Sequence, residues 1–167
     1  NVGSPVQLAA LTARLREAGD VLVAIDEEGG DVTRLEADRG SSYPGNLALG
    51  AVDDVELTEE VAAAIAGELV RVGVNLNLAP VADANTNPHN PVIGVRSFGA
   101  DPELVARHVA AFVRGTQRQG VAACAKHFPG HGDTAVDSHL ALPVVGGDLE
   151  AALLPFRAAV AAGVKAI

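Results

Sequence analysis

The amino-acid sequence predicts an α/β fold, a (β/α)8 TIM-type barrel of which this chain supplies about the N-terminal half. First, helix-like and strand-like segments alternate, and the strand-like ones begin at residues 21, 74, 121 and 164, spaced by 43 to 53 residues. Second, long polar segments follow the first three strands, whereas the links from helix to strand are short. Third, the sequence lacks a GxGxxG or Walker pattern, which disfavours the alternative of an open doubly wound sheet.

Apolar periodicity, caps and turn residues define the elements of this repeating unit. The elements expected in chain order are helix 5–18, strand 21–25, helix 56–72, strand 74–78, helix 101–120, strand 121–125, helix 155–162 and strand 164–167.

The first helix is amphipathic, because Leu8, Leu11 and Leu15 recur at spacings of three and four. The strands are short apolar runs, as expected for parallel strands that are buried on both faces. In the strand at 74–78, apolar residues alternate with asparagine. A long segment rich in Asn, Pro and Gly then covers residues 79–100, and loops of this length inside a domain are more often functional than not.

Caps place the starts of the three later helices. We expect Thr58 to cap the second helix and Asp101, followed by Pro102, to start the third. Pro155 is the expected first residue of the fourth helix, and Gly163 is expected to end it.

Composition indicates one globular domain, since 49% of the 167 residues are hydrophobic. The net charge of −9 and the scattered Lys and Arg residues argue against a nucleic-acid partner, and no apolar run approaches the roughly 20 residues of a membrane span. Cys124, the single cysteine, is expected to be a buried, inert thiol in a reducing, cytoplasmic setting. The chain has no Met and stops within an expected strand, which suggests a fragment.

The segment KHFPGHGDTAVDSH, residues 126–139, contains the densest reactive chemistry in the chain. Asp137 and His139 lie two residues apart, close enough for the carboxylate to orient the imidazole as an acid/base pair. The alternative is an ordinary turn with an exposed histidine. A metal site is disfavoured because the spacing of the candidate ligands matches no standard pattern. Those candidates are His127, His131, Asp133, Asp137 and His139.

Other polar residues at the strand ends allow two interpretations. Lys126 and His127 suit either sugar or anion contacts, or a structural pair bonded to carbonyl groups. The acidic segment from Asp26 to Arg34 is most simply a solvated turn, and Arg96 suits a structural role in the long loop. His89 and His108 suggest no function. The residues alone therefore indicate a binding or acid/base site of unknown reaction.

Three motifs together resemble the glycoside hydrolase family 3 β-N-acetylhexosaminidases of peptidoglycan recycling. They are IDEEGGDVTRL, NPHNPVIGVRSFG and KHFPGHGDTAVDSH, and they occur in the family's order. The resemblance implies a (β/α)8 barrel and retaining hydrolysis of a glycan containing N-acetylglucosamine, without metal or organic cofactor. It makes His139 the acid/base and Asp137 its partner. It also implies that the sugar is bound by Asp26, Arg34, Arg96, Lys126 and His127.

The sequence departs from this family pattern in two ways. Asp31 stands where the family usually has arginine. The family's nucleophilic aspartate lies on a later strand-end loop, beyond Ile167, so we expect residues 1–167 to form the N-terminal part of one incomplete catalytic barrel. The alternatives are a β-glucosidase or a phosphorylase of the same fold, a non-catalytic sugar-binding module and, third, a metal-dependent hydrolase.

Overall fold

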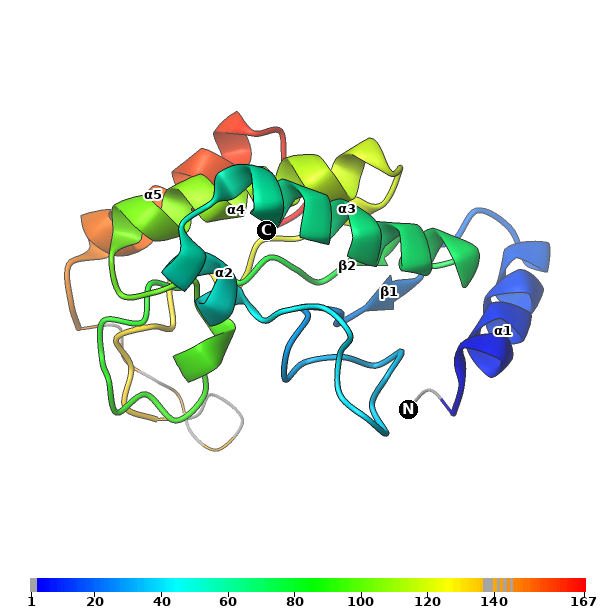
Figure 1. The fold of residues 1–167 in the computed structure, drawn as a ribbon, viewed down its shortest axis with the longest axis horizontal. Coiled ribbons are helices and arrows are strands. Elements are labelled where there is room, and N and C mark those ends of the chain that lie inside the picture. The colour runs from blue at the N-terminus through cyan, green and yellow to red at the C-terminus, as the bar shows by residue number, and fades with distance from the viewer. Residues whose placement is uncertain (1–2, 137–139, 141, 143, 145) are drawn as a thin grey trace.

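A parallel three-stranded sheet in the order β1-β2-β3 forms the centre of the computed structural model. The structure describes all residues except 1–2, 137–139, 141, 143 and 145. The elements are α1 (Pro5–Glu17), β1 (Ala24–Ile25), α2 (Asn46–Val52), α3 (Val55–Arg71), β2 (Leu76–Asn77), η1 (Gly94–Arg96), α4 (Pro102–Arg118), β3 (Ala122–Ala123) and α5 (Leu149–Ala161). In Figure 1, helices α3, α4 and α5 run above the sheet, and the segments that leave the strands lie below it.

The strands are shorter than predicted, with two residues each in place of four or five. Their register pairs Ala24 with Leu76 and Leu76 with Ala122. At the start of β2 a side chain adds to the backbone pairing: Asn75 accepts a hydrogen bond from the Val23 amide and donates one to the Val21 carbonyl, at 2.7 and 3.0 Å. The predicted fourth strand forms only a parallel bridge between Cys124 and Ala166.

The predicted cap of α3 and the predicted start of α5 are wrong, and in both cases an upstream aspartate caps the helix. Asp54 accepts hydrogen bonds from the amides of the first turn of α3, whereas Thr58 lies inside that helix. Asp148 caps α5 in the same way, so that α5 begins at Leu149 and contains Pro155 within it. A carboxylate satisfies the amides at a helix start, and these two aspartates take the place of the caps that we expected.

The α4 start is confirmed: Asp101 caps the helix by accepting from the Glu103 amide, and a proline occupies its first turn. The short helix α2 was not predicted, since its sequence follows a turn-rich segment. It approaches the 79–100 segment closely at Gly50, where an added Cβ would lie 1.8 Å from the Phe98 carbonyl oxygen. Glycine is required there by this backbone contact.

Most of the core lies between the sheet and α3, α4 and α5. Its largest fully buried side chains include Ile65 of α3, Phe112 of α4 and Phe98. A smaller cluster joins α1 to the sheet through Leu8. The predicted leucine stripe of α1 is only partly buried, because Leu11 and Leu15 remain 51 and 42% exposed.

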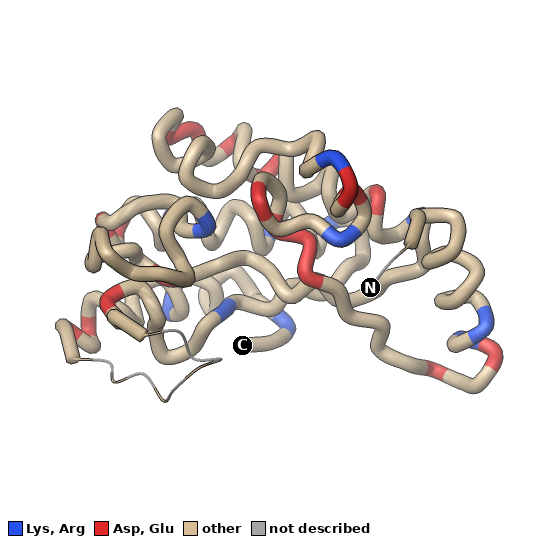
Figure 2. The backbone as a smooth tube through the Cα atoms, turned by 90° about the horizontal axis from the view of Figure 1, so that it is seen from below, with Lys and Arg blue, Asp and Glu red and all other residues tan. Residues whose placement is uncertain are grey.

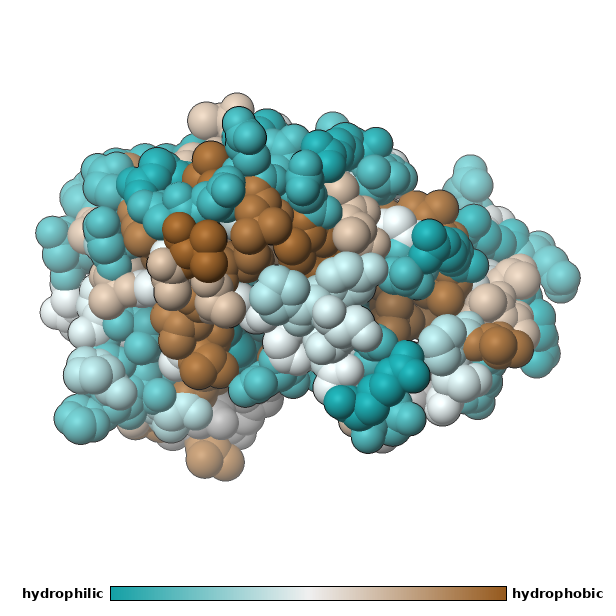
Figure 3. All heavy atoms as spheres, viewed as in Figure 1, coloured by the Kyte–Doolittle hydropathy of each residue, from teal (hydrophilic) through white to brown (hydrophobic). Residues whose placement is uncertain are grey.

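Apolar and polar surface alternate on the face shown in Figure 3. Acidic and basic residues likewise come from many parts of the chain, as Figure 2 shows. None of the helices in the described part of the chain combines the length and hydropathy needed to cross a bilayer.

Candidate functional site

A hollow of about 520 Å³, open to solvent, lies where the three strands end, and all five predicted sugar-binding residues line it. Parallel strands bring their carboxyl ends to one edge of the sheet, which explains why segments far apart in sequence meet here. The hollow is lined by Asp26, Glu28, Val32, Arg34, Leu78, Val92, Arg96, Cys124, Lys126, His127 and His131.

Glu28 holds two of the predicted binding residues in place. Its carboxylate accepts hydrogen bonds from Arg96 Nε and Nη2 at 3.0 and 2.8 Å, and it lies 2.7 Å from Lys126 Nζ. Lys126 Nζ also contacts Asp26 Oδ1 at 2.5 Å. Burial alone would raise the pKa of Glu28, but hydrogen bonds and charge from Arg96 and Lys126 outweigh it and hold that pKa below its ordinary value.

Asp83 fixes the orientation of His127. Its Oδ2 lies 2.7 Å from His127 Nδ1 and also accepts the His127 amide at 3.1 Å. On the other side of the ring, Nε2 lies 3.2 Å from Arg96 Nη2. Since guanidinium nitrogens only donate, Nε2 must be the acceptor and Nδ1 must carry the proton. These two contacts hold the imidazole ring between Asp83 and Arg96.

The segment from Asp26 to Arg34 is only partly the solvated acidic turn that charge pattern alone suggested, because its two glutamates are buried although Asp31 is exposed. Glu27 and Glu28 are only 3 and 2% exposed. Glu27 Oε2 accepts the amides of Arg34 and Leu35 at 2.8 and 3.1 Å, which closes the turn. The Arg34 side chain itself is exposed at the rim.

Asn77 attaches this turn to the sheet. Its side chain accepts the Glu27 amide at 3.1 Å and donates to the Glu27 carbonyl at 2.8 Å. Asn77 is fully buried, so these two bonds satisfy a polar group inside the protein.

Cys124 is less buried than we predicted. It is half-buried and lines the hollow at the end of β3. Burial raises the pKa of this thiol, so it carries no charge at neutral pH.

The predicted acid/base pair, Asp137 and His139, lies outside the described residues. The start of its segment is well defined: His131 is 7% exposed, its amide donates to Asp83 Oδ1 at 2.6 Å, and its Nδ1 contacts the Thr134 hydroxyl. Within the described ranges, no group of three or more His, Cys, Asp or Glu residues is arranged to hold a metal ion. Two of the ligands considered for a metal fall on the undescribed positions.

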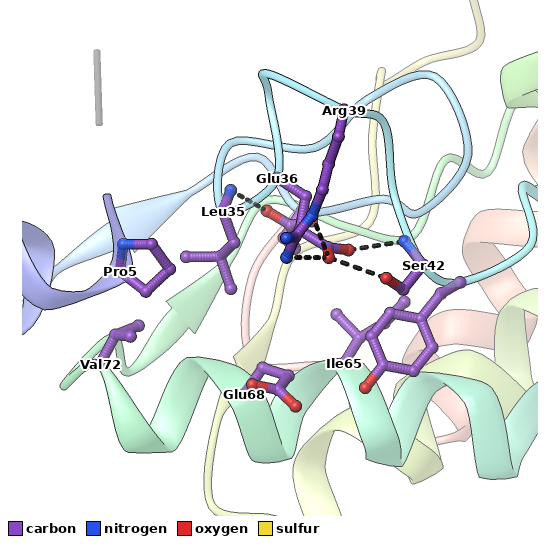
Figure 4. Close-up of a pocket in the computed structure, with 10 residues that line it drawn as sticks. Pro5, Leu35, Glu36, Arg39, Ser42, Ile65, Glu68 and Val72 are labelled. Carbon is purple, nitrogen blue, oxygen red and sulfur yellow. Dashed lines mark hydrogen bonds and ion pairs between the residues drawn. The ribbon is translucent and has the colours of Figure 1, made fainter. Parts of the chain in front are cut away.

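A second pocket, lined by Pro5, Leu35, Glu36 and Tyr43 among others, lies between α1, α3 and the segment before α2 (Figure 4). Glu36 organises the turn beside it by accepting hydrogen bonds from Ser42 and Arg39. These bonds, with the Ser42 amide contributing most, hold the pKa of Glu36 below its usual range. The predicted sugar-binding residues do not line this pocket.

Sequence reasoning missed Glu28 and Asp83 as organising residues of the site. Both are carboxylates placed shortly after an apolar strand, and this position was the available signal. Their importance lies in pairing with side chains from distant segments: Glu28 pairs with Arg96 and Lys126, and Asp83 pairs with His127. Local sequence does not reveal such pairs.

A family model described as "Glycosyl hydrolase family 3 N terminal domain" matches residues 2–167. The chain is 42% identical over 171 residues to Beta-hexosaminidase A of Pseudoalteromonas piscicida, covering 93% of this chain and 28% of that protein. A glycoside hydrolase family 3 β-N-acetylglucosaminidase from a Paenibacillus species superposes with a TM-score of 0.91 at 50% identity, covering 98% of this chain and 33% of that one.

NagZ from Neisseria gonorrhoeae, solved with N-trifluoroacetyl-D-glucosamine, superposes with a TM-score of 0.89 at 36% identity, covering 99% of this chain and 52% of that one. The chain thus spans 28 to 52% of the length of these three proteins. The predicted fold class is confirmed, since the sheet and its helices correspond to the N-terminal half of a TIM-type barrel. This chain belongs to glycoside hydrolase family 3 and matches the family's N-terminal domain.

Proposed function

We propose that residues 1–167 form the N-terminal part of the catalytic barrel of a retaining exo-β-N-acetylglucosaminidase. One observation carries the proposal: the strand-end hollow gathers Asp26, Arg96, Lys126 and His127 in one network of charge-assisted hydrogen bonds. Carboxylate, ammonium and guanidinium groups arranged in this way can bind several hydroxyl groups of one sugar. The names of the relatives support the same substrate class.

The proposed roles divide the hollow into a binding part and a reacting part. Asp26 and Lys126 bind sugar hydroxyls, and Arg34, Arg96 and His127 complete the pocket for the acetamido sugar. His139, oriented by Asp137, donates its proton to the glycosidic oxygen as the C–O bond breaks. An aspartate carboxylate that lies outside this chain forms the new bond to the anomeric carbon. Water, deprotonated by the same histidine, then releases the sugar.

The acid role of His139 is tested by comparing leaving groups in the longer enzyme that this proposal implies. Changing His139→Ala should lower kcat/KM by about 10²–10⁴-fold for a disaccharide of N-acetylglucosamine, whose leaving oxygen requires a proton. A dinitrophenyl glycoside, whose leaving group departs unprotonated, should retain most of its kcat/KM. Equal losses on both substrates would remove the acid role.

Phosphorolysis is the second candidate, because a neutral histidine acid/base does not repel an incoming phosphate as a carboxylate would. Product analysis in phosphate and in phosphate-free buffer separates the two: free N-acetylglucosamine in both supports hydrolysis, and a sugar phosphate supports phosphorolysis. Normal turnover by residues 1–167 alone would contradict the proposal that the nucleophile lies elsewhere.

A further inference from the structure

Asn46, the first residue of α2, contacts the backbone of the proposed sugar-binding residue Arg96. Its Nδ2 donates a hydrogen bond to the Arg96 carbonyl at 2.7 Å. Helix α2 lies beside η1, the short helix that ends at Arg96 (Figure 1). Glu28 and His127 contact the guanidinium group of Arg96, whereas Asn46 contacts its peptide group.

The Asn46 side chain makes this bond although its other polar atom is left unpaired. The residue is 2% exposed, and among the described residues its Oδ1 is buried without a hydrogen-bond partner. A buried polar atom without a partner lowers stability, so its presence calls for an explanation. An apolar side chain of similar size would avoid the unpaired atom, but it could not donate to the Arg96 carbonyl.

The chain just before Asn46 packs against the turn that carries Glu28. An added Cβ at Gly30 would lie 2.6 Å from the Gly45 Cα atom, and the Gly30 amide donates to the Tyr43 carbonyl at 3.1 Å. Segment 43–46 therefore contacts the Glu28 turn on one side and the Arg96 backbone on the other. Since Glu28 and Arg96 form a buried ion pair, this segment sets the distance between the backbones of the two partners.

Contacts further along α2 fix the helix from which Asn46 projects. The backbone of Gly50 packs against the Phe98 carbonyl. At the end of the helix, Asp53 Oδ1 accepts a hydrogen bond from His108 Nε2 at 3.1 Å. The His108 ring in turn stacks on Phe98, with ring centroids 5.2 Å apart. Asn46 therefore projects from a backbone that is held in place along its length.

We propose that Asn46 is a positioning residue, which fixes the Arg96 backbone so that the guanidinium group reaches both Glu28 and the hollow. The effect on activity rests on the proposed function, but the hydrogen bond does not. Arg96 is assigned to sugar binding and not to proton transfer. Displacing it should therefore weaken the binding of every glycoside substrate to the same extent.

Two substitutions separate the hydrogen bond from simple packing. Asn46→Ala removes the donor and leaves a space, whereas Asn46→Leu removes the donor and keeps nearly the same volume. Asn75→Ala is the matched control, because Asn75 also donates to a backbone carbonyl, that of Val21 at 3.0 Å, but does not line the hollow. Circular dichroism shows whether each variant is folded, and if Asn46→Ala is not, Asn46→Leu decides alone.

The kinetic experiment uses the disaccharide and the dinitrophenyl glycoside with the longer enzyme. Both Asn46 variants should lower kcat/KM by about 10- to 100-fold, and equally on the two substrates, since small displacements of an interacting group have effects of this size. Asn75→Ala should retain the kcat/KM of the parent. The inference is overturned by an unchanged kcat/KM in Asn46→Leu, by an equal loss in Asn75→Ala, or by a loss confined to the disaccharide.

Nuclear magnetic resonance separates failure of this inference from failure of the proposed function, because it needs neither sugar nor activity. His127 Nε2 lies 3.2 Å from Arg96 Nη2, so its nitrogen signal reports the position of the guanidinium group. That signal, assigned with His127→Gln, should shift in both Asn46 variants and stay in place in Asn75→Ala. An unchanged signal in the Asn46 variants would refute the positioning role. A shifted signal in a protein that cleaves neither glycoside would uphold that role and refute the proposed function alone.

Discussion

At the scale of single residues, the site depends on buried carboxylates that are not among the predicted sugar contacts. Glu28 and Asp83 are 2 and 1% exposed, and each pairs with cationic or ring nitrogens from other segments. A buried charge is stable only when it is paired and hydrogen-bonded, so these carboxylates and their partners depend on one another. The positions of the more exposed side chains of the site therefore depend on these buried carboxylates.

The Glu28→Gln variant tests this dependence. The neutral amide keeps the size of the side chain but leaves Arg96 and Lys126 without their shared negative partner. We expect the free energy of unfolding to fall by about 3 kcal/mol at neutral pH. Affinity for N-acetylglucosamine, measured by calorimetry, should fall as well, because the two cations are no longer held together. Chemical unfolding followed by circular dichroism measures the first effect.

Glu60→Gln is the matched control for this variant. Glu60 is exposed on α3, so the same chemical change should alter the free energy of unfolding by less than about 0.5 kcal/mol. If Glu28→Gln has no larger effect than this control, the carboxylate does not organise the site.

The sequence predicted which residues line the hollow better than it predicted their contacts. The motifs located Asp26, Arg34, Arg96, Lys126 and His127 at strand ends, and all five line one hollow. Their roles in sugar binding stay a prediction. Charge pattern alone suggested a solvated turn, because the local sequence does not show that Arg96 and Lys126, from distant segments, form ion pairs with the buried Glu28.

At the scale of elements, α3 and α4 pack so closely that one position must be glycine. An added Cβ at Gly115 of α4 would lie 2.2 Å from the Glu59 carbonyl oxygen and 2.9 Å from Ala62 Cβ. The obstacle includes backbone, which cannot rotate away as a flexible side chain could. The separation of the two helices is therefore set by the absence of a side chain at this position.

Alanine substitutions at Gly115 and at Gly67 should change the free energy of unfolding in opposite directions. Gly115→Ala should lower the free energy of unfolding by about 1–3 kcal/mol, because it forces the helices apart. Gly67→Ala, in the interior of α3 with nothing near its added Cβ, should raise it by about 0.5–1 kcal/mol, because alanine favours helix. Thermal unfolding of both variants measures the difference. Stabilisation by Gly115→Ala would contradict the close packing.

Periodicity located most of the long helices within a few residues, but the α5 start was misplaced and the strand lengths were overestimated. The α4 start was correct because cap and proline coincide in sequence at Asp101 and Pro102. The α5 start was wrong because Pro155 is the more prominent local signal, although Asp148 supplies the cap. Strand length was overestimated because the Val23 amide donates to the Asn75 side chain where a longer strand would use a backbone carbonyl, and periodicity does not distinguish the two.

At the scale of the whole molecule, the buried ion pairs link stability to pH. The pKa of Glu28 in the folded protein lies below its ordinary value of 4.5. The folded state therefore binds this proton less readily than the unfolded state. Glu28 accordingly contributes stability above pH 4.5, and that contribution is lost as the pH falls through the lowered pKa.

Comparing the parent protein with Glu28→Gln isolates this contribution. The difference in their free energies of unfolding should be constant near neutral pH and should shrink as the pH falls below 4.5. Urea titrations at several pH values down to about pH 3 measure it. A difference that stays constant over the whole range would show that the carboxylate is not stabilised by its charge.

The two bonds of Asn77 have a consequence for how the barrel edge is built. An amide side chain has the same kinds of donor and acceptor as a peptide group. The Asn77 side chain therefore hydrogen-bonds to both the amide and the carbonyl of Glu27, as the backbone of a neighbouring strand would. Hydrogen bonds between the two segments continue in this way beyond β1, although residues 26–28 are not part of the strand. Asp26 and Glu28 can therefore direct their carboxylates toward the hollow while both peptide groups of Glu27 remain paired.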